Sequence, residues 1–282
     1  MFNLITSVED LEFLSKELSA SEAIAVDTEF RRTSKEHIEL SLIQINDSQE
    51  TYIVDCLVIK DTSSISTVFE DDRTIKVLHS CKEDIEAINS WTEGGINNIY
   101  DTQLANAFLG HELSISYQAI VKEEFDVTLK KEETRSNWIR RPLRESQLNY
   151  AAMDVEYLLE IYESQVEKLK LDGKDQWLKE ETDLITKNLL KGIDTINEDE
   201  NNLIPISKSE VTLVLSKFNK IIDRAAESNF INKTLLFSKK SQKDFLKEYF
   251  AIGLEAAMST KGKWRRILIY DEMYEMLSSL SF

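Results

Sequence analysis

The stretch Ile-Ala-Val-Asp-Thr-Glu-Phe, residues 24–30, is an apolar run of β-strand character that ends in two acidic residues, Asp27 and Glu29. Successive side chains of a strand point to opposite faces, so these two carboxylates would share one face at the end of a buried strand. Like charges repel each other there, and burying them without a partner is costly, so we expect a cation or a hydrogen-bond network beside them. The alternative is a strand that simply runs into a polar loop, and only further acidic residues elsewhere in the chain decide between the two.

The composition indicates an acidic globular protein. Its 282 residues are 42% hydrophobic, which is sufficient for one large domain or two ordinary ones. The formal net charge of -17 argues against a protein that coats nucleic acid, but not against an enzyme that handles phosphates through metal ions. The charge is also uneven, because residues 205–282 carry 13 basic and 9 acidic side chains, whereas residues 1–204 carry 21 and 42.

The sequence also bears on the compartment. Two cysteines, Cys56 and Cys81, are too few and too far apart for a disulfide framework and indicate a reducing environment. The first ten residues lack the basic and apolar regions of a signal peptide, and no apolar run approaches the length of a transmembrane helix. We therefore expect a cytoplasmic protein that does not associate with a membrane.

The apolar pattern predicts a mixed α/β fold. A helix is expected to begin at a capping box over residues 6–9, and three consecutive strands are expected within residues 23–55. Further strands near residues 76–79 and 98–100 then alternate with helices near residues 82–90, 104–110 and 116–124. In such folds the active site lies at the carboxyl ends of the parallel strands.

A basic loop follows at residues 130–144. It contains six Lys and Arg residues and Trp138 against two glutamates, and Pro142 stands where the next helix would begin. A charge run is usually a solvated face. In an otherwise acidic region, however, a basic loop with an aromatic side chain is a candidate contact for a nucleic-acid backbone.

The helix predicted over residues 145–170 carries Tyr150 and Asp154. Their spacing of four places a phenol and a carboxylate on one helical face, one turn apart. The small residues Ala151 and Ala152 between them would let the helix approach its neighbours closely. Taken alone, the pair is better explained as a core tyrosine and a surface aspartate of an amphipathic helix.

A polar segment at residues 194–202 predicts a linker, and helical patterns dominate beyond it. We expect a first domain over residues 1–193, a linker over residues 194–206, and a small all-helical domain over residues 207–282. The basic side chains of this last domain are suited to holding phosphates.

Three segments together resemble one known set of motifs. Asp-Thr-Glu-Phe at residues 27–30 is similar to the first motif of the DEDD exonuclease superfamily, and His-Ser-Cys-Lys-Glu-Asp at residues 79–84 to the second. Tyr-Ala-Ala-Met-Asp at residues 150–154 is similar to the third, in the form of the tyrosine-containing DEDDy branch. Within that branch, residues 1–190 resemble the ribonuclease D family.

The C-terminal part carries a fainter resemblance, to a single HRDC module, over residues 235–246 and 262–267. The fold that both resemblances imply is a ribonuclease H-like mixed-sheet exonuclease domain followed by a small all-helical HRDC-like domain.

The resemblance implies a 3′-5′ exoribonuclease. Asp27, Glu29, Asp84 and Asp154 would hold two divalent ions, Mg²⁺ or Mn²⁺, about 3.5–4 Å apart at the 3′-terminal phosphate. Tyr150 would orient the attacking water. The substrate would be RNA, such as the 3′ ends of tRNA precursors or other structured RNA tails, and the product a nucleoside 5′-monophosphate. The side chains expected to contact the substrate are those of Thr28, Phe30, His79, Arg135 and Arg141.

Three other interpretations remain open from the sequence. The same four carboxylates would also serve a DNA 3′-5′ exonuclease of repair or proofreading. A non-catalytic nucleic-acid-binding module is disfavoured, because all four carboxylates and the tyrosine are present. Zinc binding is also disfavoured, because no known ligand spacing is formed by His37, His79, His111, Cys56 and Cys81. We expect the protein to act as a monomer.

Overall fold

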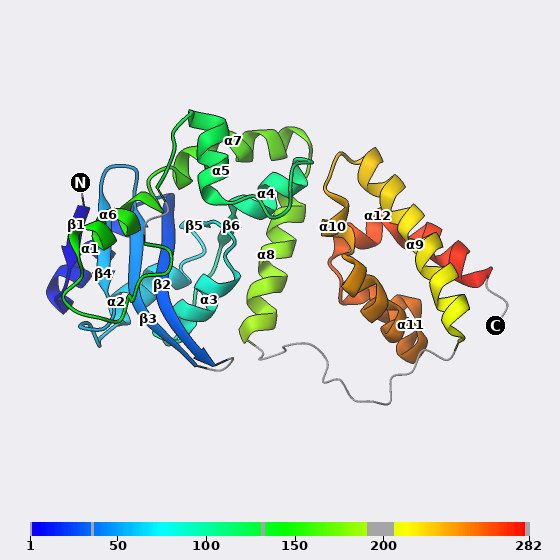
Figure 1. Cartoon of the computed structure of the whole chain (residues 1–282), viewed down its shortest axis with the longest axis horizontal. Helices are drawn as coiled ribbons and strands as arrows, with labels where there is room; N and C mark the ends of the chain where they lie inside the picture. The colour runs from blue at the N-terminus through cyan, green and yellow to red at the C-terminus, as the bar shows by residue number, and fades with distance from the viewer. Residues whose placement is uncertain (1, 35–36, 131–132, 191–205, 280–282) are drawn as a thin grey trace.

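The computed structural model describes residues 2–34, 37–130, 133–190 and 206–279. Strands within these residues form a six-stranded sheet in the order β1-β4-β3-β2-β5-β6 (Figure 1). β3 pairs antiparallel with both β2 and β4. β1 pairs in parallel with β4, and β5 pairs in parallel with β2 and β6, so the predicted mixed sheet is confirmed. The strands are β1 (Phe2–Ile5), β2 (Ala23–Ser34), β3 (His37–Asn46), β4 (Thr51–Asp55), β5 (Ile75–Leu78) and β6 (Ile99–Asp101).

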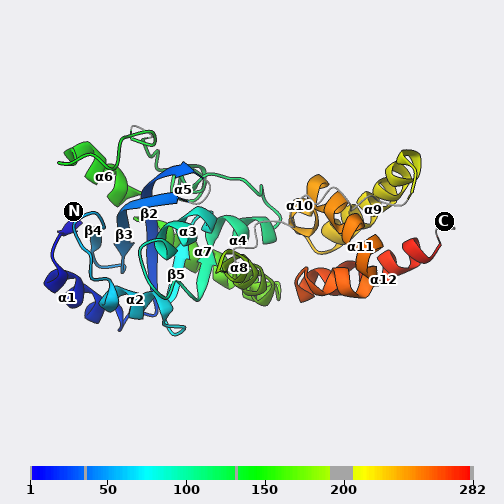
Figure 2. The same ribbon diagram turned by 90° about the horizontal axis from the view of Figure 1, so that it is seen from below.

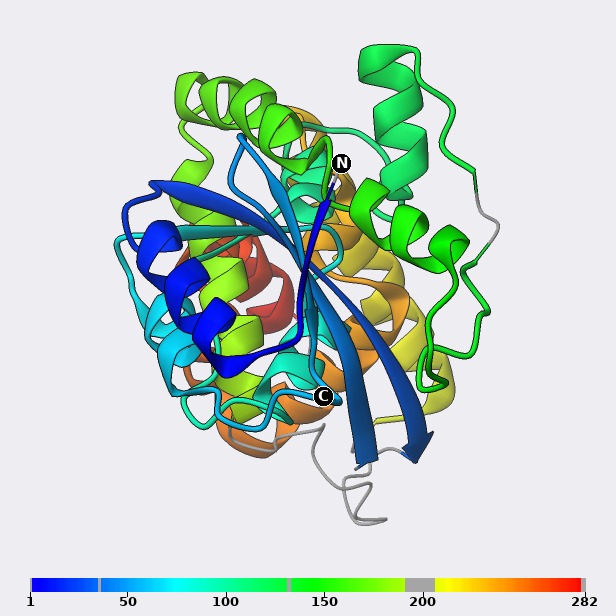
Figure 3. The same cartoon turned by 90° about the vertical axis from the view of Figure 1, so that its left-hand side faces the viewer.

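β2 and β3 extend beyond the rest of the sheet. β5 pairs with β2 only over residues 23–25, and β4 pairs with β3 only over residues 42–46. The far ends of β2 and β3 therefore form a two-stranded arm (Figure 3). Asp27 and Glu29 lie where β2 leaves the sheet, next to the carboxyl end of β5.

Helices cover both faces of the sheet. The alternation of side chains along β2 sends Ile24 and Val26 into a core shared with α1, α2 and α3, whereas Ala25 packs in a core with α4, α5 and α7. α6 lies across the sheet from α1 and α2 (Figure 2). The helices are α1 (Val8–Leu18), α2 (Ser63–Glu70), α3 (Lys82–Asn89), α4 (Thr102–Phe108), α5 (Tyr117–Phe125), α6 (Glu145–Met153), α7 (Leu158–Leu171) and α8 (Asp175–Leu190).

Two local predictions were wrong, and two elements were missed. The N-cap of α1 is Ser7, whose hydroxyl accepts from the Asp10 amide at 3.1 Å, so the predicted capping box lies one residue too early. The single helix expected over residues 145–170 is two helices, α6 and α7, separated by residues 154–157. The short strand β1 and the helix α2 were not predicted.

The C-terminal part is all-helical, as predicted. It consists of α9 (Lys208–Ser228), α10 (Lys233–Leu236), α11 (Lys239–Ser259) and α12 (Lys263–Ser278). α11 is kinked at Gly253, where φ is 81° and the backbone leaves helical geometry. Most of the predicted linker, residues 194–205, lies outside the described residues, so the domain boundaries stay a prediction.

The helical domain packs directly on the first domain. The indole of Trp264 in α12 stacks on Trp177 of α8 with ring centroids 5.8 Å apart, and meets the Phe108 ring edge-on at 5.0 Å. Glu181 of α8 accepts two hydrogen bonds from the Arg265 guanidinium, at 2.5 and 2.8 Å. One apolar core therefore continues from α4, α7 and α8 into α9–α12.

Among the described residues, every helix is too short or too polar to cross a membrane.

Candidate active site

The first two acidic residues come from β2. Asp27 is paired with Gln44 of β3 and Glu29 with Leu42, and a bulge follows between Glu29 and Phe30. Residues two apart on a strand share a face, so both carboxylates project to the same side as the sequence predicted. Both side chains are half-buried.

The third acidic residue, Asp84, follows the turn that connects β5 to α3. Asp101 at the end of β6 fixes this turn, because its carboxylate accepts from the backbone amides of Ser80 at 3.1 Å and Cys81 at 2.9 Å. Asp84 then lies in the first turn of α3, buried, and accepts a hydrogen bond of 2.5 Å from the Thr28 hydroxyl. α3 is thereby held against β2.

Tyr150 and Asp154 come from the end of α6. Tyr150 lies in the last helical turns and Asp154 is the C-cap. The Tyr150 hydroxyl lies close enough to the Asp154 carboxyl group to lower its pKa, and it lies 3.2 Å from the Thr134 hydroxyl. The predicted pairing of phenol and carboxylate is therefore present, although Asp154 ends a helix rather than lying inside one.

Burial and mutual repulsion raise the pKa of all four carboxyl groups. Burial is the largest cause in each case. Glu29 has a pKa raised to about 10, with further contributions from Asp27, Asp154 and Asp84 in that order. The pKa of Asp154 rises to about 7, with Asp84 as the repelling neighbour. Three separate elements thus bring the four carboxylates into one acidic cluster.

The chemistry of this acidic cluster fits divalent cations. Its donors are all carboxylate oxygens, which suit Mg²⁺ and Mn²⁺, and a cation would relieve the repulsion that raises these pKa values. Among the described residues, no group of three or more His, Cys, Asp and Glu side chains already stands in a metal-holding arrangement. Asp84 accepts from the Thr28 hydroxyl through Oδ1, which leaves its second oxygen for an ion.

The residues expected to contact the substrate are differently placed. Thr28 is buried against Asp84, and Phe30 is half-buried beside Glu29 on β2. Both ring nitrogens of His79 are engaged, with the Thr102 hydroxyl at 2.9 Å and the Ile115 carbonyl at 3.0 Å. Arg135 is exposed in the basic loop. Substrate contacts by these residues stay a prediction.

Arg141 holds the basic loop to the sheet. Its Nε and Nη2 atoms each lie 2.7 Å from an oxygen of the Asp55 carboxylate, whose side chain is only 6% exposed. Nη1 donates to the Trp138 carbonyl at 2.7 Å, and the Ser41 hydroxyl donates to the same carbonyl at 2.6 Å. Through these contacts Arg141 holds the loop in place, and a substrate contact by Arg141 stays a prediction.

The His and Cys side chains considered as zinc ligands do not form a cluster. Cys56 and Cys81 are buried free thiols, and Cys56 donates to the Val54 carbonyl. His79 uses both nitrogens elsewhere. The structure therefore gives the zinc interpretation no support.

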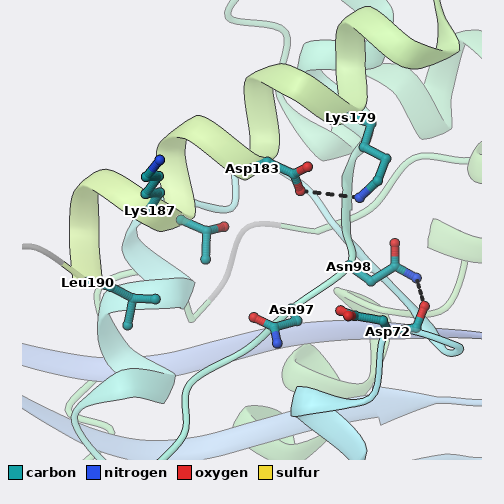
Figure 4. A pocket seen from close by; sticks show the side chains of 8 residues that line it. Asp72, Asn97, Asn98, Lys179, Asp183, Lys187 and Leu190 are labelled. Atoms are coloured by element: carbon teal, nitrogen blue, oxygen red, sulfur yellow. Dashed lines mark hydrogen bonds and ion pairs between the residues drawn. The ribbon is translucent and has the colours of Figure 1, made fainter. Parts of the chain in front are cut away.

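A pocket of about 710 Å³, lined mainly by polar residue types, lies away from the acidic cluster, near the amino ends of β5 and β6 (Figure 4). Its Lys179 and Asp183 form an ion pair of 3.3 Å, and the Asn98 amide donates to the Asp72 carbonyl. None of the candidate catalytic residues is among its lining residues, which are Asp72, Asn97, Asn98, Lys179, Asp183, Thr186, Lys187 and Leu190.

A mixed sheet with an Asp-x-Glu pair on a central strand, joined at its rim by two aspartates and a tyrosine, is an arrangement suited to divalent ions at a phosphodiester. A model of the 3′-5′ exonuclease family matches residues 2–170. The chain therefore belongs to the 3′-5′ exonuclease family.

Known relatives confirm the resemblance to ribonuclease D. The chain is 38% identical to ribonuclease D of Pseudomonas paraeruginosa over 171 residues, which are 61% of this chain and 45% of the relative. Identity to ribonuclease D of Escherichia coli is 38% over 160 residues, 57% of this chain and 43% of the relative. The chain thus spans about half the length of the curated relatives it matches.

The similarity extends to a solved structure. The crystal structure of Escherichia coli RNase D, described as an exoribonuclease involved in structured RNA processing, matches with a TM-score of 0.67 at 25% identity. The match covers 100% of this chain and 76% of that one, so the C-terminal helices are included.

Proposed function

We propose that this protein is a metal-dependent 3′-5′ exoribonuclease that shortens RNA from its 3′ end and releases nucleoside 5′-monophosphates. The observation that carries the proposal is the acidic cluster, in which three elements bring together four carboxyl groups whose pKa is raised by burial and then by repulsion from neighbouring carboxylates. Such a cluster is costly for the fold and is suited to cations that neutralise developing charge on a phosphate. Similarity to ribonuclease D supports RNA as the polymer. Structured tails and tRNA precursors are the substrates we expect.

Asp27, Glu29, Asp84 and Asp154 would hold the divalent ions. Two such ions, when bound, supply a water of lowered pKa and relieve the charge on the leaving oxygen. The Thr28 hydroxyl donates to one oxygen of Asp84 and leaves the other for an ion. Tyr150 would donate its hydroxyl proton to substrate or water.

Tyr150 would orient the attacking water rather than deprotonate it. Burial, followed by repulsion from Asp154, raises the pKa of the Tyr150 phenol above its ordinary value. The hydroxyl is therefore protonated near neutral pH and acts as a hydrogen-bond donor. The Thr134 hydroxyl lies 3.2 Å away, within hydrogen-bonding distance of it.

The substrate would approach along the basic loop. Arg135 and Arg140 are exposed there, and Trp138 packs beneath with its ring 6.1 Å from that of Tyr150. Exposed cations of this kind bind phosphates of the backbone without reading the base sequence. The HRDC-like domain would add a second basic surface. Monomeric, cytoplasmic action stays a prediction.

One assay tests the proposal. A 5′-labelled single-stranded RNA and its DNA counterpart are incubated with the protein and Mg²⁺, Mn²⁺ or EDTA, and the products are resolved by length. We expect a metal-dependent ladder of 3′-shortened products, formed faster from RNA. Faster shortening of DNA would favour the repair or proofreading alternative, and no shortening of either polymer would refute the enzyme.

A further inference from the structure

The fourth carboxylate, Asp154, lies in a break between two helices. α6 ends at Met153 and α7 begins at Leu158, so residues 154–157 connect them. Asp154 keeps one helical contact, from its amide to the Ala151 carbonyl at 3.3 Å. The direction of its side chain therefore depends on whatever fixes both sides of this break.

Tyr117 of α5 bridges the break. Its hydroxyl donates to the Met153 carbonyl at 3.1 Å and accepts from the Tyr157 amide at 3.0 Å. Met153 immediately precedes Asp154, and Tyr157 is the N-cap of α7. A single phenol thus ties the end of one helix to the start of the next, and both of its hydrogen bonds go to the backbone.

The ring of Tyr117 is itself held in place. Tyr117 is 6% exposed, and its ring lies 6.0 Å from the imidazole of His79. That imidazole donates through Nε2 to the Ile115 carbonyl and meets the Thr102 hydroxyl through Nδ1. Thr102 of α4 and Ile115 before α5 therefore fix the imidazole that lies beside the Tyr117 ring.

We propose that Tyr117 is a positioning residue that holds Asp154 in the acidic cluster by bridging the break between α6 and α7. This inference rests on the proposed function, because it assigns Asp154 to a metal site. Loss of the hydroxyl would leave the Tyr157 amide without its partner and the Met153 carbonyl with only the Glu156 amide at 3.4 Å. Residues 154–157 would then be held less firmly, and the Asp154 carboxylate would be positioned less accurately in the acidic cluster.

Tyr100 supplies a matched control. It is also a buried tyrosine, 8% exposed, and its hydroxyl has no hydrogen-bond partner among the described residues. Tyr117→Phe and Tyr100→Phe therefore make the same chemical change in similar burial, but only the first breaks the bridge. Each purified full-length variant is titrated with Mn²⁺ by calorimetry, and its kcat and KM on RNA are measured.

We expect Tyr117→Phe to bind Mn²⁺ about tenfold more weakly and to lower kcat with little change in KM. Tyr100→Phe should match the wild type in both measurements. In an Asp154→Asn background, Tyr117→Phe should cause no further loss of Mn²⁺ affinity, because the two residues act through one carboxylate.

The outcomes separate the two proposals. A wild type that binds no Mn²⁺ contradicts the proposed function, whatever Tyr117 does. A wild type that binds Mn²⁺ while Tyr117→Phe binds equally well overturns the positioning role. If Tyr117→Phe does not fold, 4-aminophenylalanine at position 117 restores a donor for the Met153 carbonyl. Its amino group is a poor acceptor for the Tyr157 amide, so only half of the bridge is restored and Mn²⁺ affinity must be intermediate. Wild-type affinity in that protein would overturn a role that depends on bridging both sides of the break.

Discussion

At the residue scale, the carboxylates of the acidic cluster oppose the stability of the metal-free fold. Desolvation and mutual repulsion favour their protonated forms, which raises the pKa of Asp27 and Asp84 well above the ordinary value. A group of this kind contributes stability below its unfolded pKa and loses it as the pH rises through its folded pKa. Near neutral pH the metal-free protein therefore bears a cost that bound cations would remove.

Replacing Asp84 by Asn should separate this cost from catalysis. Asn keeps an acceptor for the Thr28 hydroxyl but cannot carry the charge. We expect RNA hydrolysis to fall on the order of 10³-fold or more, with a melting temperature in EDTA no lower than that of the wild type. Tyr150→Phe should lose only about 10²-fold, since its role is to orient. A fully active Asp84→Asn protein would contradict the assignment of four carboxylates to the metal site.

The pH dependence of metal binding follows from Asp154. Its pKa is about 7 in the folded protein against an ordinary 3.8, so a proton occupies this carboxyl increasingly as the pH falls below 7. Divalent ions must displace that proton. Mn²⁺ affinity should therefore fall as the pH is lowered from about 8 to 6, by about tenfold per pH unit or more, because Glu29, whose pKa is about 10, must also release its proton. Calorimetry in two buffers of different ionisation enthalpy measures the protons released; constant affinity across this range would contradict the cluster.

At the scale of elements, some features were predictable and others were not. β2 could be recognised because an apolar run ends in two acids, and the motifs around Asp84 and Asp154 completed the set. The break after α6 could not be predicted, because Ala151, Val155 and Leu158 remain buried at helical spacing across it. β1 was missed because it has four residues and only Ile5 is buried. The roles of Asp101 and Tyr117 depend on contacts between distant segments, which no local pattern records.

The ion pair of Arg141 and Asp55 should stabilise the basic loop. Arg141→Ala leaves the Asp55 carboxylate buried without its cation, which should lower the free energy of unfolding by about 3 kcal/mol. RNA hydrolysis should also slow, because the loop carries Thr134 beside Tyr150. Urea unfolding measures the first effect. Lys122→Gln, which breaks an exposed ion pair with Asp126, is the control and should change stability by less than about 0.5 kcal/mol.

At the scale of the whole molecule, the two predicted domains share an interface that the sequence did not reveal. The polar linker and the change in charge predicted separate units, and the helical content of the second was confirmed. Trp177 and Trp264 are distant in sequence, so their stacking followed from no pattern. Lys174 adds a polar contact, donating to the carbonyls of Phe108 and Phe230. We therefore expect the two domains to unfold together.

The substitution Glu181→Gln should uncouple the unfolding of the two domains. The Arg265 guanidinium would lose its buried carboxylate, at a cost of about 3 kcal/mol in the interface. Calorimetry should then show two thermal transitions in place of one. Asp183→Asn on the same helix breaks only an exposed ion pair and should leave a single transition. A single, unshifted transition in Glu181→Gln would show that this contact does not couple the domains.

The count of bound Mn²⁺ ions tests the central claim most directly. Wild-type protein and the Asp27→Asn variant are titrated with Mn²⁺ in the presence of a nucleoside 5′-monophosphate, the expected product, and free Mn²⁺ is measured by electron paramagnetic resonance. If the four carboxylates form a two-metal site, the wild type binds two ions per chain and Asp27→Asn binds fewer, with weaker affinity. Equal binding by the two proteins, or none by the wild type, would contradict the account.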